Sequence, residues 1–133
     1  MTTQQHDLDH ELQAAIYTYL DACTLVHRAN VEACRVAGRA FSGNPDVEVD
    51  KTKETVFLDT EAKTFRASFS LHVGRNYVRI NCGKQIFGYV AHSDTKRVRR
   101  GFLLKAGARG PALNVARGNV LTGQYKPTGI CIS

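Results

Sequence analysis

The chain lacks several features that would assign it to a familiar class at once. Its 133 residues contain no tryptophan, one methionine, three prolines and only 8% aromatic residues. No apolar run reaches the roughly 18 residues that a membrane helix requires. Met1–Asp9 has no positively charged segment followed by an apolar one, as a secretory signal would have. We therefore expect neither a membrane span nor a signal peptide.

Sequence motifs for catalysis and metal binding are missing as well. The four cysteines (Cys23, Cys34, Cys82 and Cys131) form no Cys-x-x-Cys pair, which argues against a zinc knuckle or a thioredoxin-like site. No phosphate-binding P-loop, dinucleotide fingerprint or nucleophile elbow is found. We expect reduced thiols in a cytoplasm, and a protein that is not an enzyme and needs no cofactor or metal.

Acidic residues are scarce in one half of the chain. The net charge of the whole chain is +6. Residues 1–60 hold five basic and ten acidic residues, a net charge of −5. Residues 61–133 hold thirteen basic and two acidic residues, a net charge of +11. Such asymmetry predicts an anionic partner for the basic half, or self-association of unlike surfaces. The length and the 43% hydrophobic content predict one domain, residues 1–133, with a core of its own.

Residues 6–42 have the apolar period of a helix. Positions three and four apart carry Leu8, Leu12, Ile16, Tyr19, Leu20, Cys23 and Val26. A helix of about 35 residues spans roughly 50 Å, several times the radius of gyration of a small domain. It must therefore break, protrude or pack against another subunit. We favour a homo-oligomer formed through this helix, with a break near Asn30 as the alternative.

The apolar period changes to two after a polar connector, residues 43–54. Residues 55–105 predict an antiparallel sheet. Its expected strands are 64–73, 76–82, 85–92 and 97–105, and Thr55–Leu58 could add an edge strand. Residues 106–133 are rich in glycine and proline and predict loops with short strands.

Turn residues set the expected register of this sheet. Two-residue turns are predicted at Gly74-Arg75 and Gly83-Lys84, and a longer one at Ser93–Lys96. The first turn would set Leu71 against Val78, the second Val78 against Tyr89, and the third Ala91 against Val98. The predicted fold is therefore α+β, with a long N-terminal helix, or two helices, packed on a four- to five-stranded antiparallel meander.

Cations gather around the last predicted strand and the glycine-rich segment after it. Guanidinium groups and exposed backbone N–H groups bind phosphate oxygens, and an aromatic ring on the same sheet face could stack on a base. The candidate residues for nucleic-acid or phosphate binding are Arg66, Tyr77, Arg79, Arg97, Arg99, Lys105, Arg109, Arg117, Gly118 and Asn119.

One segment of the chain resembles a known group of proteins. Residues 105–112 (Lys-Ala-Gly-Ala-Arg-Gly-Pro-Ala) and 116–120 (Ala-Arg-Gly-Asn-Val) are similar to a pattern in small uncharacterised tailed-bacteriophage proteins. The resemblance implies a phage origin and the bacterial host cytoplasm, and it implies no activity. Those proteins have a tryptophan between Lys-Ala and Pro-Ala that is missing here, so no stacking role is carried over to this segment.

The interpretation that these features favour is a non-enzymatic phage-type protein that holds nucleic acid, most simply single-stranded, on a basic sheet and loop surface. Two alternatives remain open. One is an oligomeric anti-defence protein that sequesters an anionic nucleotide signal or inhibits an acidic host protein. The other is a minor structural protein of the virion.

Overall fold

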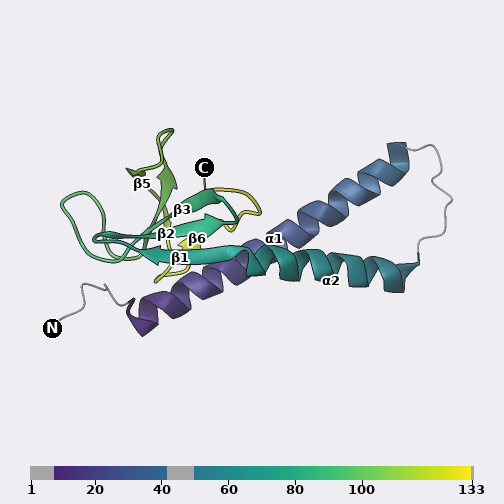
Figure 1. Cartoon of the computed structure of the whole chain (residues 1–133), viewed down its shortest axis with the longest axis horizontal. Coiled ribbons are helices and arrows are strands. Elements are labelled where there is room, and N and C mark those ends of the chain that lie inside the picture. The colour runs from purple at the N-terminus through teal and green to yellow at the C-terminus, as the bar shows by residue number, and fades with distance from the viewer. Residues whose placement is uncertain (1–7, 42–49, 133) are drawn as a thin grey trace.

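Two antiparallel helices and one six-stranded antiparallel sheet make up the fold (Figure 1). The computed structural model describes residues 8–41 and 50–132. The elements are α1 (His10–Phe41), α2 (Lys51–Ala67), β1 (Phe69–Val73), β2 (Tyr77–Cys82), β3 (Gln85–Ala91), β4 (Phe102–Ala106), β5 (Ala112–Asn119) and β6 (Gln124–Tyr125). The strands follow one another in chain order across the sheet. The α+β class is confirmed, with six strands instead of four or five.

Helix α1 confirms the predicted N-terminal helix and continues without a break at Asn30. The outermost predicted positions, 6, 7 and 42, lie outside the described residues. The first half of α1 packs against the sheet, where Leu12, Ile16 and Leu20 are completely buried beside Val78 and other core residues. The second half extends past the sheet and runs beside α2 (Figure 1). In the described part of the chain, no helix has the length and apolar character of a membrane span.

Helix α2 corrects three predictions. Its residues were expected to form the end of the connector, the optional edge strand Thr55–Leu58 and the start of the strand 64–73. The remaining connector positions, 43–49, lie outside the described residues. Asp50 starts the helix, because its side chain accepts the backbone N–H groups of Thr52 and Lys53 at 3.0 and 3.2 Å.

Ion pairs hold α2 against α1. Arg35 donates two hydrogen bonds to the carboxylate of Glu54, at 2.7 and 2.9 Å, and Arg28 donates to Asp59 at 3.2 Å. Hydrogen bonding from Arg35 lowers the pKa of Glu54 below its usual value. The Arg35 guanidinium also lies over the ring of Phe57, 4.0 Å from its centre. These contacts make the two helices a hairpin that projects from the sheet.

The turn between β1 and β2 lies one residue later than predicted. Val73 pairs with Val78, where the predicted partner of Val78 was Leu71. The Gly74 N–H donates to the Tyr77 carbonyl at 2.8 Å, so that Arg75 and Asn76, not Gly74 and Arg75, form the turn. Because the register moved by two residues, each side chain stays on its expected face of the sheet.

The turn between β2 and β3 is confirmed, but the register beyond it is not. Cys82 pairs with Gln85 across Gly83-Lys84, as expected. A β-bulge between Ile80 and Asn81 then shifts the pairing by one residue. Val78 faces Val90 instead of Tyr89, and Tyr89 lies opposite Arg79. A shift of one residue exchanges the two faces of a strand, so Tyr89 joins the polar face.

The predicted strand 97–105 is wrong for its first five positions. The predicted pairing of Ala91 with Val98 is therefore wrong as well. β4 starts at Phe102, and residues 92–101 form a loop. Side chains of the loop satisfy its backbone: Thr95 Oγ1 accepts the N–H groups of Arg97 and Val98, and Asp94 accepts that of Arg100. Val98 is buried below this loop.

Strand β5 and the C-terminal segment complete the sheet and the core. β5 has eight residues and is longer than the short strands predicted for this region. β6 pairs with it only through Gly118 and Asn119. Further along, the Ile132 N–H donates to the Phe87 carbonyl at 2.8 Å, and the Ile132 side chain enters the main core.

Candidate nucleic-acid interface

A hollow of about 290 Å³ lies on the sheet face that points away from the main core. It is lined by His72, Gly74, Arg75, Asn76, Tyr77, Arg79 and Tyr89. Arg79 is at its centre, because the sheet register places His72 on one side of it and Tyr89 on the other. The hollow thus combines cations, an imidazole and two phenol rings.

The two tyrosine rings are held by contacts with the β5 side of the sheet. Their centroids lie 6.1 Å apart, with the ring planes at 69°. The Tyr77 hydroxyl donates to Asn114 Oδ1 at 3.3 Å, and the Tyr89 hydroxyl donates to the Gly110 carbonyl. Both rings also pack against a small apolar cluster of Ala91, Val98 and Leu104. A flat ligand would therefore meet rings that are already oriented.

Arg79 contains a buried donor that nothing in the described residues satisfies. Its Nε is inaccessible to solvent and has no hydrogen-bond partner there. A buried polar atom without a partner costs about 1–3 kcal/mol, and more when it is charged. An anionic oxygen is the acceptor that a guanidinium binds best. The hollow therefore has the chemistry of an anion site next to an aromatic surface.

The structure brings further predicted residues to this face. Val98 is buried in the cluster on which Tyr77 packs, and its neighbours Arg97 and Arg99 are exposed on either side of it. Arg109 is exposed beside Gly110, which binds Tyr89. Two of the ten predicted residues, Tyr77 and Arg79, thus line the hollow, and Arg97, Arg99 and Arg109 lie on loops next to residues that contact its tyrosines.

The remaining predicted residues lie elsewhere or support the fold. Arg66, expected on the sheet face, is on the last turn of α2 and binds Asp21 at 2.7 Å. Lys105 is exposed on β4, and Arg117 lines a different hollow. At Gly118, a Cβ would lie 2.6 Å from the Gln124 carbonyl oxygen, so glycine is required for close approach of the strands.

Asn119 holds the turn that follows β5. Its Oδ1 accepts the backbone N–H of Leu121 at 2.8 Å and that of Thr122 at 3.4 Å. These bonds fix the path of the chain from β5 to β6. The amide of Asn119 is thus committed to the turn, which is a structural role.

The acidic helix neutralises only part of the basic half. Arg100 binds Asp9 and Glu11 at the start of α1, in the same way that Arg66 binds Asp21. A hydrogen bond from the Glu11 N–H, together with the charge of Arg100, lowers the pKa of Asp9. Within residues 8–41 and 50–132, Arg75, Arg79, Arg97, Arg99 and Arg109 form no ion pair. Two of these arginines, Arg75 and Arg79, line the hollow.

Sequence reasoning missed Arg75, Asn76 and Tyr89 as parts of this site. The position of Arg75 and Asn76 at a turn was predictable to within one residue. Tyr89 had no such signal, because only the bulge at Ile80–Asn81 moves it to the polar face.

Comparisons with known proteins add no assignment to this geometry. No protein-family model, no curated protein and no solved structure matches the chain. In the described part of the chain, no group of three or more histidine, cysteine, aspartate or glutamate side chains could hold a metal ion.

Proposed function

We propose that the protein is a non-enzymatic binder of single-stranded nucleic acid, with the hollow around Arg79 as its central contact. The observation that carries the proposal is the Arg79 side chain, which lines the hollow together with Tyr77 and Tyr89 and whose Nε has no partner in the described residues. Arg79 as a whole is only partly buried, so a phosphate oxygen in the hollow could bind its guanidinium, and a base could stack on Tyr77 or Tyr89.

The shape of the site favours a single strand over a duplex. The hollow of about 290 Å³ is small and open, and its aromatic rings are accessible only to a base that has left its own stack. Neighbouring phosphates could then lie on Arg75, Arg97 and Arg99, which are exposed. Such contacts are independent of sequence and weaken as salt rises.

A binding assay with a defined oligonucleotide tests the proposal. The anisotropy of a labelled 12-nucleotide oligothymidylate is titrated with the wild-type protein and with Arg79→Gln, Arg79→Lys and Lys63→Gln. Lys63 is exposed on α2 and serves as the matched loss of one charge. We expect Arg79→Gln to weaken binding by about tenfold, Arg79→Lys by less, and Lys63→Gln hardly at all.

Circular dichroism establishes that each variant is folded before its affinity is compared. If the wild-type protein does not bind at low salt, or if Arg79→Gln and Lys63→Gln weaken binding equally, the site is wrong. Thermal stabilisation by a cyclic nucleotide, with no effect of the oligothymidylate, would instead favour the nucleotide-sequestering alternative.

The setting that we propose is the cytoplasm of a phage-infected bacterium. It is supported by the similarity of residues 105–112 and 116–120 to tailed-bacteriophage proteins. Purified virions of the source phage, probed with an antibody, distinguish an early cytoplasmic protein from a virion component.

We also propose that the protein self-associates through the projecting half of α1. Leu25 and Val36 are 69% and 52% exposed there, although both are large and apolar. Exposed alanines (Ala29, Ala33, Ala37 and Ala40) lie between and beyond them on the same shallow groove. Small side chains let two helix backbones approach closely, so a second copy of α1 fits this surface.

A further inference from the structure

The outer edge of β5 is unpaired for most of its length. β6 covers only Gly118 and Asn119. Among the described residues, no strand lies beside positions 112–117 on that side of β5, which forms the margin of the sheet in Figure 1. An unpaired edge presents backbone N–H and C=O groups to any extended chain that approaches it.

Exposed apolar side chains mark the same edge. Leu113 and Val115, at alternating positions of β5, are 40% and 51% exposed. Proteins usually protect an exposed edge with charges, prolines or a short strand. Between Pro111 and Arg117 this edge has neither a proline nor a charge. An apolar edge without protection is expected where a partner covers it.

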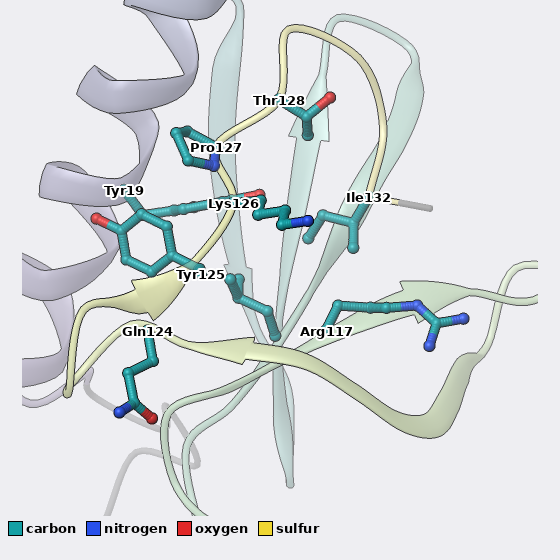
Figure 2. A pocket seen from close by; sticks show the side chains of 9 residues that line it. Tyr19, Arg117, Gln124, Tyr125, Lys126, Pro127, Thr128 and Ile132 are labelled. Atoms are coloured by element: carbon teal, nitrogen blue, oxygen red, sulfur yellow. The ribbon is translucent and has the colours of Figure 1, made fainter.

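A hollow of about 560 Å³ continues this edge (Figure 2). It forms because the chain leaves β6 after Tyr125 and turns toward α1, where Gly129 lies against His27. Tyr19, Leu103 and Ile132 give it apolar walls. A strand added beside β5 would thus find room for an apolar side chain at one end.

Charge selects the partner for this edge. The hairpin of β4 and β5, residues 102–119, contains Lys105, Arg109 and Arg117 and no acidic residue, and Lys126 lies on the hollow. A second copy of the same edge would bring like charges together. An extended acidic segment would instead complement them.

We propose that β5 binds an extended acidic segment of another protein as an added strand. Backbone hydrogen bonds to positions 112–117 would supply affinity. Apolar side chains of the partner, packed against Val115 and inserted into the hollow, would supply specificity. No residue of β5 lines the hollow around Arg79, although Asn114 of β5 accepts a hydrogen bond from Tyr77. The proposal therefore goes beyond nucleic-acid binding and does not depend on it.

Defined peptides test this proposal on the full chain. The first is a fluorescein-labelled eight-residue peptide that alternates glutamate or aspartate with valine. The second replaces its acids by lysine, and the third is N-methylated at alternate amides along one edge. We expect saturable binding of the acidic peptide alone, with slower amide hydrogen exchange at positions 112–117.

Two variants distinguish specific peptide binding at the β5 edge from nonspecific binding elsewhere on the protein. Val115→Glu should weaken binding of the acidic peptide by tenfold or more. Val56→Glu, the same change at a 61% exposed position of α2, should leave this binding unchanged. Thermal melts show that both variants fold.

Four results would overturn the proposal. They are the absence of saturable binding at millimolar peptide, equal binding of the lysine or N-methylated peptide, equal effects of the two variants, and a peptide-free dimer whose positions 112–117 are already protected from exchange. The last result would assign the edge to a second copy of the chain.

Discussion

Gly88 and Ile132 provide a quantitative test of how the C-terminal segment packs on the sheet. A Cβ placed on Gly88 would lie 2.2 Å from Ile132 Cδ1 and 2.8 Å from its Cγ1, distances at which atoms overlap. Ile132 is only 6% exposed, and its N–H binds the Phe87 carbonyl. The Ile132 side chain therefore packs directly against the backbone of β3, and no space remains there for a further methyl group.

Each single change should destabilise the protein for a different reason. Ile132→Ala removes buried atoms and leaves a cavity, which costs about 2–5 kcal/mol; we expect the lower part of this range, because the chain end can relax. Gly88→Ala adds a methyl group without space for it, which costs about 1–3 kcal/mol. In the double variant the new methyl group occupies part of the cavity. The cost of the double variant should then be smaller than the sum of the two single costs by about 1–3 kcal/mol, the whole cost of Gly88→Ala.

Urea unfolding followed by circular dichroism measures this coupling. The double variant should be no less stable than Ile132→Ala alone. If the effects of the two changes simply add, the two groups do not share a space. If Gly88→Ala leaves the free energy of unfolding unchanged, the Ile132 side chain does not pack on β3. The hollow beside β5 would then lack one of its walls.

Three further predictions concern salt, pH and self-association. Replacing both Arg97 and Arg99 by glutamine should reduce the slope of log K for oligothymidylate against log salt by about 1.4, since each phosphate contact contributes about 0.7; an unchanged slope would place the strand elsewhere. The lowered pKa of Glu54 means that its stabilising effect is complete above the normal glutamate pKa and is lost as pH falls through the lower, folded value. Glu54→Gln should therefore reduce the melting temperature at pH 7 but not at a pH below both pKa values, and an equal reduction at both would refute the assignment. Sedimentation should show association of the wild type that Leu25→Glu and Val36→Glu abolish, whereas a wild-type monomer at high concentration would exclude that interface.

Helix α1 could be predicted from the sequence because the positions that are buried along it are the same positions that carry apolar residues. Leu12, Ile16 and Leu20 face the sheet at the expected spacing. The sequence also indicated that such a helix outgrows one small domain, and the structure places its second half beside α2 instead of breaking it.

Helix α2 could not be recognised because its residues favour strands in isolation. It contains several β-branched residues, and Phe65, Ala67 and Phe69 alternate as in a strand. Inside the helix, Thr55 and Thr60 donate their hydroxyls to carbonyls one turn earlier, at 2.9 and 2.7 Å, which makes them compatible with it. The capping bonds of Asp50 and the packing against α1 then outweigh local propensity.

The loop 92–101 shows how short-range polar contacts can replace a regular turn. The arginines on either side of Val98 alternate with it as in a strand, so the sequence predicted one. Thr95 and Asp94 instead bind backbone N–H groups of the loop, and Arg100 reaches the acidic start of α1. The other cations of this loop, Lys96, Arg97 and Arg99, are therefore exposed on an irregular segment.

The bulge between β2 and β3 explains why the candidate site could be predicted only in part. Alternation along one strand is a local property, and it correctly placed Tyr77 and Arg79 on one face of the sheet. The position of Tyr89 depends on how two strands are aligned, and a single extra residue in β3 moves its ring from the core face to a place opposite Arg79. The residue pattern of each strand gives no sign of that insertion. The hollow, in which Tyr89 lies opposite Arg79, is therefore a product of the pairing and not of either strand alone.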